Sequence, residues 1–214
     1  MQLGGHALVA DDHPLTREGL ALAIRAAAPG IALDNAGSVA EAERAVATRR
    51  SGYRLVLLDL ILPDARGFSG FLKLQHLLAA TPIVVVSARE DPVIVEAARA
   101  LGAAAFVSKS TPLDALAAAL RRVLAGEAVF PPQSLASPAA LSLRDRISTL
   151  SGAQLRVLLA LADGRLNKQI ADSLDITEAT VKAHLTVIFR KLAVDNRAQA
   201  LLAVQPLLAA TGTP

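Results

Sequence analysis

Five side chains suited to phosphoryl chemistry stand at the ends of short apolar runs in the first half of the chain. They are Asp11, Asp12, Asp59, Ser87 and Lys109. In an open α/β sheet, the carboxyl ends of parallel strands meet at one edge, so these side chains are expected to converge. Three carboxylates that lie together repel one another unless a hard divalent cation sits among them, and Mg²⁺ prefers such oxygen ligands. The pattern therefore predicts a Mg²⁺ site.

Asp59 is the best placed nucleophile of this group. A carboxylate beside Mg²⁺ and a lysine can attack phosphorus, because both cations offset the charge on the transferring phosphoryl group. Lys109 would pair with one phosphoryl oxygen, and the Ser87 hydroxyl would donate to another. Each residue alone has an ordinary explanation as a loop acid, a solvated charge or a strand-end hydroxyl. Their joint placement at four strand ends favours a functional site.

The elements that must position these residues alternate from residue 6 to about 125. Short apolar runs are followed by amphipathic segments, such as residues 15–28 and 41–48, and this alternation is typical of repeated βα units. Continuously apolar runs favour a parallel sheet that is buried on both faces. The last helix should be capped by Thr111, with Pro112 at its first position and Asp114 in its first turn. The expected strands are residues 6–10, 31–36, 55–60, 83–87 and 104–108.

Composition narrows the class of protein but does not assign a function. The 214 residues fit two modest domains, and no segment approaches the ~20 uncharged apolar residues that cross a bilayer. No long apolar run precedes Asp11, so we expect no signal peptide, and a cytoplasmic protein without a membrane partner. The absence of cysteine excludes disulfides and thiolate metal sites. A formal charge of +3 is too small to indicate nucleic-acid binding by itself, so the position of the charge must carry that argument.

Residues 6–125 resemble a response-regulator receiver domain. The resemblance is carried by Asp11-Asp12-His13-Pro14, Leu57-Leu58-Asp59-Leu60 with Pro63 and Gly67, Val86-Ser87-Ala88, and Phe106-Val107-Ser108-Lys109 with Pro112. It implies a flavodoxin-like, doubly wound α/β fold whose five-stranded parallel sheet has the order 2-1-3-4-5. Leu62, where the family often has methionine, is a volume-conserving departure.

This resemblance also implies a set of roles. A sensor histidine kinase would phosphorylate Asp59, while Asp12, Asp59 and the backbone carbonyl of Ile61 would bind Mg²⁺ with help from Asp11. Ser87 and Phe106 match the hydroxyl and aromatic switch positions. On phosphorylation the hydroxyl would move toward the phosphoryl group, and the aromatic ring would turn inward.

The second half of the chain has a different pattern. Residues 126–147 contain Pro131, Pro132 and Pro138 among serines and alanines, a composition typical of a linker. From Leu150 onward the pattern is helical, with short breaks at residues 163–164 and 175–177 and no strand signals. The expected organisation is therefore a receiver domain at residues 1–125, a linker at 126–147 and a small all-α domain at 148–214.

The break at residues 175–177 separates two helices, as in a helix-turn-helix. Thr177 is a suitable N-cap for a helix from Glu178 to about Leu192. The face predicted to pack in the core carries Val181, Leu185, Ile188 and Leu192. The opposite face mixes small residues with bases, as a helix that enters the major groove requires, and it carries Ala179, Lys182, Ala183, Thr186 and Arg190. A solvated helix face is the ordinary alternative for such a charge run.

Residues 148–208 resemble the LuxR/NarL-type (FixJ) helix-turn-helix family. The matching motifs are Asn167-Lys168-Gln169-Ile170-Ala171, Thr180-Val181-Lys182-Ala183-His184 and Arg190-Lys191-Leu192. The family implies dimerisation through the final helix, about Arg197 to Leu208, and double-stranded DNA as a partner. Ala153-Gln154 replaces the usual Arg-Glu pair, so the polar tethering of the first helix of this domain would be altered. The expected DNA contacts are Asn167, Lys168, Ala179, Thr180, Lys182, Ala183, His184, Thr186, Arg190 and Lys191.

The sequence thus predicts a two-component response regulator, in which phosphorylation of Asp59 controls dimerisation and promoter binding, with RNA polymerase as a further partner. Two alternatives remain at this point. A Mg²⁺-dependent phosphohydrolase of the haloacid dehalogenase type would carry a general acid two residues after its nucleophile, where this chain has Ile61, so turnover as an enzyme is not expected. A regulator whose receiver is never phosphorylated would bind DNA equally well when Asp59 is replaced.

Overall fold

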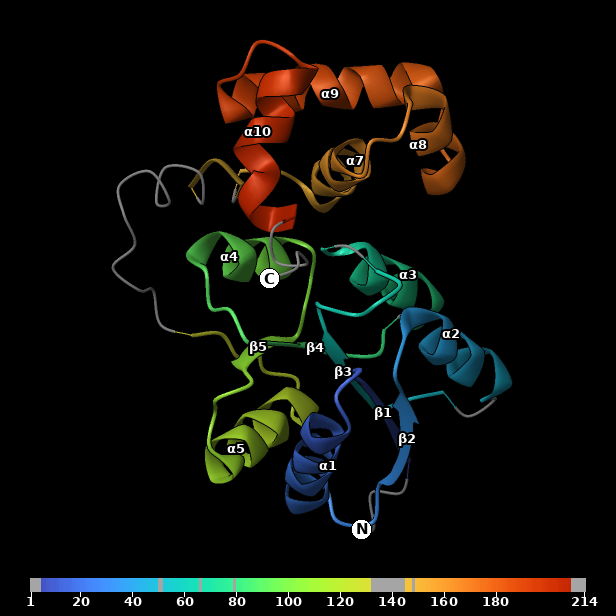
Figure 1. Cartoon of the computed structure of the whole chain (residues 1–214), viewed down its shortest axis with the longest axis vertical. Helices are drawn as coiled ribbons and strands as arrows, with labels where there is room; N and C mark the ends of the chain where they lie inside the picture. The colour runs from blue at the N-terminus through green and yellow to red at the C-terminus, as the bar shows by residue number, and fades with distance from the viewer. Residues whose placement is uncertain are drawn as a thin grey trace. The chain divides into compact units, whose positions relative to one another are not determined.

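The described chain forms two compact units (Figure 1). The first contains residues 1–90 and 103–132, and the second contains residues 91–102 and 133–214. Most of the expected linker at residues 126–147 lies outside the described residues. The computed structural model describes residues 5–49, 52–65, 67–78, 80–131, 145–147 and 149–208.

A five-stranded parallel sheet in the order β2-β1-β3-β4-β5 forms the centre of the first unit. This order confirms the arrangement that the resemblance to a receiver domain implied. Each strand begins and ends within one residue of the bounds expected from the sequence. The strands are β1 (His6–Ala10), β2 (Ala32–Ala36), β3 (Leu55–Asp59), β4 (Ile83–Ser87) and β5 (Ala105–Ser108).

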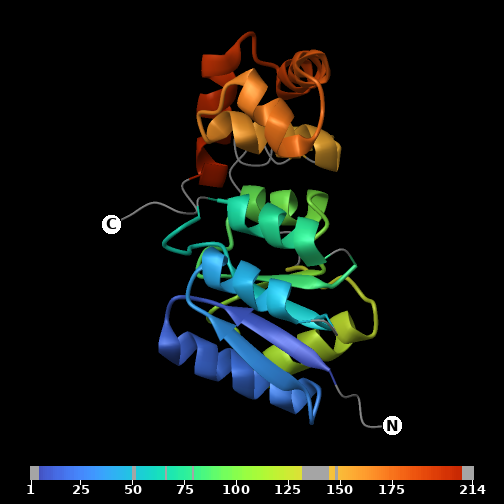
Figure 2. The same ribbon diagram turned by 90° about the vertical axis from the view of Figure 1, so that its right-hand side faces the viewer.

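Helices cover both faces of this sheet (Figure 2). On one face α1 (Pro14–Ala27) packs beside α5 (Leu113–Leu124), and on the other α2 (Val39–Thr48) packs beside α3 (Ser69–Leu78). Successive strand residues point to opposite faces, so both sets of side chains must be apolar. This burial explains the continuous apolar runs of the sequence. In chain order α4 (Pro92–Ala100) follows β4, and it groups with the second unit.

Two details of the first unit differ from the sequence expectation. Helix α5 begins at Leu113, because Pro112 has an extended ψ of 146° and occupies the N-cap position. Thr111 was therefore wrongly expected to cap this helix, and its backbone N–H instead donates to the carbonyl of Ser108. Val129, inside the expected linker, forms a parallel bridge with Ala105 of β5. The sheet unit thus extends beyond its last helix.

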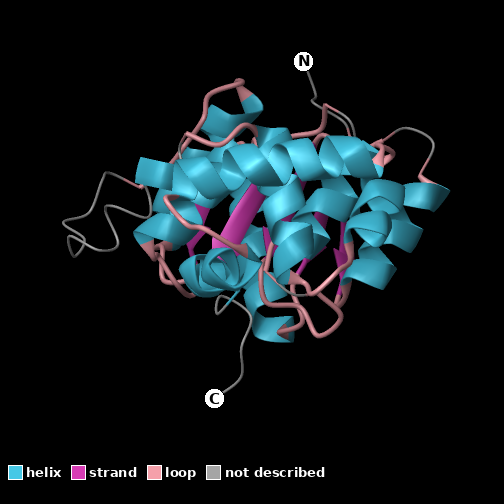
Figure 3. Cartoon of the chain, turned by 90° about the horizontal axis from the view of Figure 1, so that it is seen from above, coloured by secondary structure: helices cyan, strands magenta, loops and turns pink. Residues whose placement is uncertain are grey.

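The second unit carries the helix-turn-helix. Its elements after the linker are α7 (Gly152–Ala162), α8 (Asn167–Leu174), α9 (Glu178–Leu192) and α10 (Arg197–Leu208), and every regular element in the described part of residues 145–208 is a helix (Figure 3). Asp175 ends α8 in the left-handed conformation (φ 52°), and the Thr177 side chain caps α9 by accepting from the N–H of Thr180 at 3.1 Å. The expected breaks and caps of this region are confirmed. Among the described residues, no helix has the length and apolarity to cross a membrane.

Candidate functional site

The strand register brings the predicted phosphoryl-site residues to one edge of the sheet. In the parallel ladder, Ala10 pairs with Leu58, Asp59 with Val86, and Ser87 with Ser108. The strands β1, β3, β4 and β5 therefore end at nearly the same level. The residues that end or follow them share the carboxyl edge, where ligands bind in open α/β sheets.

Lys109 links two buried carboxylates at this edge. Its Nζ lies 2.7 Å from Asp59 Oδ2 and 2.8 Å from Asp11 Oδ2. Asp11 is fully buried and Asp59 is 3% exposed, so the ammonium stabilises two negative charges that water cannot reach easily. The other oxygen of Asp59, Oδ1, accepts the backbone N–H of Ile61 at 3.0 Å. Both carboxylates are thus held in place by groups at the edge.

The surroundings shift the pKa values of both charged partners. Burial raises the pKa of Asp59 above its ordinary value, although hydrogen bonds from Lys109 and Ile61 oppose this rise. Burial lowers the pKa of Lys109, but the carboxylates of Asp11 and Asp59 outweigh it, so the net pKa is raised. Lys109 therefore stays charged at neutral pH. Asp59 ionises less readily than a solvated aspartate.

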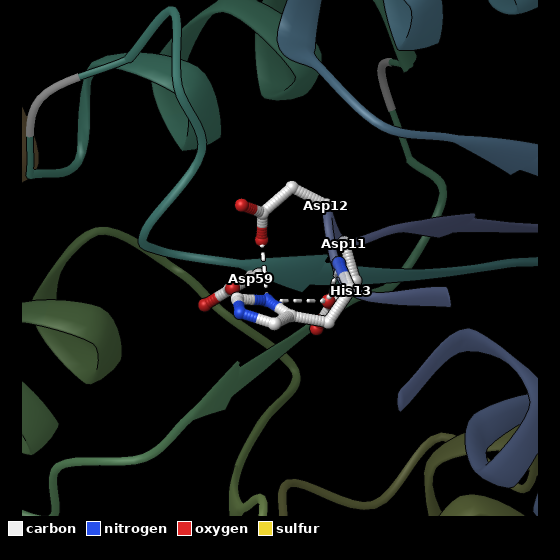
Figure 4. A group of neighbouring side chains, drawn as sticks. All are labelled: Asp11, Asp12, His13 and Asp59. Carbon is white, nitrogen blue, oxygen red and sulfur yellow. Dashed lines mark hydrogen bonds and ion pairs between the residues drawn. The ribbon is translucent and has the colours of Figure 1, made fainter. Parts of the chain in front are cut away.

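Asp12 and His13 complete the acidic edge on its exposed side (Figure 4). His13 Nδ1 lies 2.6 Å from Asp12 Oδ1 and 3.5 Å from Asp11 Oδ1. The backbone N–H of His13 also donates to Asp11 Oδ1 at 2.8 Å. His13 was not among the site residues expected from the sequence. Its position directly after Asp12 was the available signal.

The donor set fits a hard divalent cation. One ligand atom from each of Asp11, Asp12, His13 and Asp59 lies within 4.8 Å of the others. The three carboxylates outnumber the single ammonium of Lys109, so the edge carries excess negative charge that a cation would offset. Carboxylate oxygens suit Mg²⁺, which typically keeps several waters and binds one or two protein carboxylates. The receiver site is therefore compatible with Mg²⁺.

The two expected switch residues, Ser87 and Phe106, are both buried. Ser87 is 1% exposed, and its Oγ accepts the backbone N–H of Arg89 at 3.1 Å. Phe106 is 2% exposed, so its ring is buried. The Ser87 hydroxyl has a local partner that it would exchange if it moved toward Asp59. Movement of either side chain remains a prediction.

Helix α9 has a buried apolar face and an exposed face of small and basic residues, as expected from the sequence. Val181, Leu185, Ile188 and Leu192 are buried, as predicted from their spacing. The opposite face is exposed, and so is Lys168 on α8, whereas Asn167, Thr180 and His184 are half-buried. Small side chains let a helix approach base edges, while bases between them can contact phosphates. The exposed residues of α9 from the expected set are Ala179, Lys182, Ala183, Thr186 and Arg190.

Lys191 differs from the other bases of α9. It is half-buried, and its Nζ donates to the carbonyl of Thr149 at 2.6 Å and to Gln154 Oε1 at 2.9 Å. Gln154 also accepts the N–H of Ser151 in a capping box at the start of α7. A polar tether between α7 and α9 therefore exists despite the loss of the Arg-Glu pair. Lys191 serves this tether within the unit.

Two family models match the chain. The response regulator receiver domain matches residues 7–121, and the luxR family of bacterial regulatory proteins matches residues 148–204. A glycerol metabolism activator from Pseudomonas putida is 35% identical over 205 residues, which is 91% of this chain and 92% of that protein. The nitrate/nitrite response regulator NarL from Escherichia coli K12 is 33% identical over 203 residues, which is 90% of this chain and 91% of NarL.

A solved structure shares the fold over most of the chain. RcsB from Salmonella enterica serovar Typhimurium, determined bound to the promoter rprA with the phosphomimetic BeF3−, has a TM-score of 0.58 at 20% identity. The alignment covers 94% of this chain and 98% of RcsB. The parallel sheet with its acidic edge defines a receiver domain, and α8 and α9 form the helix-turn-helix joined to it. The chain belongs to the response regulators that combine a receiver domain with a luxR-family DNA-binding domain.

Proposed function

We propose that the chain is a transcription regulator switched by phosphorylation of Asp59, with a sensor histidine kinase as the phosphoryl donor. The observation that carries this proposal is the contact of Lys109 with both Asp59 and Asp11, two carboxylates that are buried at the carboxyl edge of the sheet. A buried acid with a raised pKa beside a fixed ammonium is typical of a reactive site. Asp12 adds a further negative charge to the cation-binding side of this edge, and His13 adds a nitrogen ligand atom.

The proposed reaction is a phosphoryl transfer to a carboxylate. An oxygen of Asp59 attacks phosphorus, the bond from phosphorus to the kinase imidazole nitrogen breaks, and the imidazole leaves with that electron pair. Lys109 stays in place and pairs with a phosphoryl oxygen. Bound Mg²⁺ would supply further positive charge, held by Asp12, Asp59 and the Ile61 carbonyl with help from Asp11. The absence of a general acid at Ile61 argues against rapid turnover.

The proposed switch then acts through Ser87 and Phe106. The Ser87 hydroxyl would leave the N–H of Arg89 and donate to the phosphoryl group, and the buried ring of Phe106 would turn further inward behind it. The phosphorylated chain would form a homodimer, in which α10 joins the two DNA-binding units. Two recognition helices would then meet a two-fold related site.

Helix α9 is the proposed recognition helix. Ala179, Ala183 and Thr186 would approach base edges, while Lys182 and Arg190 would contact phosphates. Asn167, Lys168, Thr180, His184 and Lys191 complete the proposed contact set. RcsB, which shares the fold, is solved on promoter DNA, and this supports the same partner for this chain.

The remaining assignments complete the proposal. The proposed domains are a receiver domain at residues 1–125, a linker at 126–147, in which Val129 still bridges β5, and a DNA-binding domain at 148–214. The protein would act in the cytoplasm as a regulator rather than as an enzyme, with RNA polymerase as a further partner at the promoter.

The test measures DNA affinity and oligomeric state at one fixed salt concentration. Intact protein and Asp59→Asn would each be compared with and without Mg²⁺ and a small acyl phosphate donor. We expect the donor to promote dimers and tighten DNA binding only when Asp59 is present. Unchanged affinity and mass in the intact protein would show that the receiver works without phosphorylation.

A further inference from the structure

Asp64 ties the loop after the phosphoacceptor strand to helix α2. Its Oδ1 accepts the N–H of Val39 and its Oδ2 accepts the N–H of Ala40, both at 2.8 Å. These two N–H groups belong to the first turn of α2, where no carbonyl of the same helix can reach them. One carboxylate from a loop 24 residues away in sequence therefore satisfies two helix donors. Desolvation raises the pKa of the exposed Asp64, but hydrogen bonds from Ala40 and Val39 outweigh it, so the net pKa is lowered and the accepting form persists at neutral pH.

The same loop carries groups of the phosphoryl site. Ile61, whose carbonyl is a proposed Mg²⁺ ligand, donates its N–H to Asp59 Oδ1 at 3.0 Å. The N–H of Ala65 donates to the carbonyl of Leu62 at 3.1 Å, which closes a turn around Asp64. The loop is thus held by Asp59 at its beginning and by Asp64 near its end. Ile61 lies between these two anchors.

The loop after β3 also packs closely against the starts of α2 and α3. A Cβ atom on Gly70, at the start of α3, would lie 2.7 Å from Val39 Cγ2 and 3.3 Å from Ala65 Cβ. The first turns of α2 and α3 and the loop between β3 and α3 are therefore closely packed. Such packing couples the position of the loop to the helix that Asp64 binds. Loss of the Asp64 contacts would leave the loop held at its second anchor by packing alone.

We propose that Asp64 is a positioning residue for the cation and phosphoryl site, because it holds the loop of Ile61, whose N–H binds Asp59 and whose carbonyl is a proposed Mg²⁺ ligand. The inference rests on the proposed function, since it needs Mg²⁺ at the acidic edge. Mg²⁺ demands nearly ideal octahedral geometry, so a small displacement of one ligand costs affinity. Residues that orient metal ligands without touching the metal typically contribute about 10–100-fold in affinity.

The chain provides two matched controls for this test. Ser38 caps the same helix, since its Oγ accepts the N–H of Glu41 at 3.2 Å, but it has no bond to the loop after β3 among the described contacts. Ser38→Ala therefore weakens α2 without releasing that loop. Glu41 Oε2 accepts the N–H of Gly37, so Glu41→Gln removes a negative charge from the same helix start. Together these variants separate positioning from helix stability and from charge.

The experiment measures the dissociation constant of Mg²⁺ alone by calorimetry, and the rate of Asp59 phosphorylation by a small acyl phosphate. The proteins are the full-length chain, Asp64→Ala, Asp64→Asn, Ser38→Ala and Glu41→Gln, each checked for folding by circular dichroism. We expect Asp64→Ala to weaken Mg²⁺ binding on the order of 10-fold. Asp64→Asn, which retains one acceptor oxygen, should lose less. Both control variants should bind Mg²⁺ as the unmodified chain does.

The other possible results distinguish a failure of the Asp64 inference from a failure of the proposed function. If Asp64→Ala and Ser38→Ala change Mg²⁺ affinity equally, Asp64 acts through helix stability alone and the inference fails. An equal loss in Glu41→Gln would make charge the cause and would also overturn it. If the unmodified chain neither binds Mg²⁺ nor accepts phosphate, the proposed function fails before Asp64 is tested.

Discussion

At the scale of single residues, the acidic edge balances attraction and repulsion within a buried space. Lys109 contacts Asp11 and Asp59, yet the three carboxylates of the edge outnumber its single charge. Burial makes unpaired charge expensive, which is why the pKa of Asp59 is raised rather than lowered. Additional positive charge, such as a bound cation, would therefore stabilise this edge. This balance leads to two predictions.

Asp59→Asn should increase stability at neutral pH when divalent cations are absent. The folded-state pKa of Asp59 is raised above its ordinary value of 3.8, so its ionisation opposes folding. This loss of stability grows as the pH rises from 3.8 through the folded-state pKa, and it persists at higher pH. The gain in stability of Asp59→Asn should therefore shrink as the pH falls toward 3.8. Thermal unfolding between about pH 4 and 8 measures this, and Mg²⁺ should stabilise the unmodified chain more than the variant. A variant that is less stable at neutral pH would contradict the argument.

Lys109→Ala should destabilise the first unit when metal is absent. It leaves Asp11 and Asp59 buried without their cation, at a cost of about 1–3 kcal/mol. The cost should decrease at lower pH, since protonation of Asp59 then relieves the repulsion. Chemical denaturation at two pH values measures it, and Lys73→Ala, a change at an exposed lysine of α3, is the control. Equal losses in the two variants would argue against a special role for Lys109.

At the scale of elements, polar tethers decide how the helices of the second unit are held. Lys191 joins the end of α9 to Gln154 at the start of α7. Arg197 similarly reaches back from α10, where its Nη2 donates to the carbonyl of Arg165 at 2.8 Å. Lys191, an expected DNA contact, and Arg197 therefore both stabilise the fold.

Gln154→Glu should stabilise the second unit by about 0.5 kcal/mol, because it turns the contact with Lys191 into an ion pair at a helix N-terminus. Gln169 is a matched control, since it accepts the N–H of Leu166 in the same way at the start of α8, and the described contacts give it no ammonium partner. Gln169→Glu should give a smaller gain. Thermal unfolding at low and high salt measures both, and a gain in Gln154→Glu that survives high salt would contradict the ion-pair explanation.

Gly70→Ala should destabilise the packing of α2 against α3. The new Cβ would meet Val39 and Ala65, and such overpacking typically costs about 1–3 kcal/mol, against a gain of about 1 kcal/mol in helix propensity. Gly19 in α1 has no neighbouring atom within 4 Å of the position that a Cβ would take, so Gly19→Ala should stabilise by about 0.5–1 kcal/mol. Urea denaturation of both variants measures the difference. A stabilised Gly70→Ala would show that the two helix starts can separate easily.

At the scale of the whole molecule, DNA binding should depend on salt through the bases of α9. Lys182 and Arg190 are exposed, whereas Lys191 is engaged with α7. Lys182→Ala and Arg190→Ala should each reduce the slope of log affinity against log salt by about 1, if each contacts one phosphate. Binding titrations at several salt concentrations measure the slopes. The control Lys73→Ala, on α3, should leave them unchanged, and unchanged slopes in the α9 variants would remove α9 from the interface.

Much of this molecule could be predicted from local sequence patterns. The alternation of apolar runs and amphipathic segments predicted the strands within one residue, because burial on both sheet faces imposes apolar side chains on every strand position. The stripe of Val181, Leu185, Ile188 and Leu192 likewise predicted the buried face of α9. Asp11, Asp12, Asp59 and Lys109 could be selected because strand ends in a parallel sheet share one edge.

The sequence by itself therefore determined the class of fold, the candidate acids and the orientation of α9. Only the tertiary structure decided which partners these residues take. Asp64 binds the start of α2 and Lys191 binds Gln154, and local periodicity reports neither of these contacts. The reason is physical: periodicity records which face of an element is buried, whereas a hydrogen bond between distant segments depends on how whole elements pack against one another.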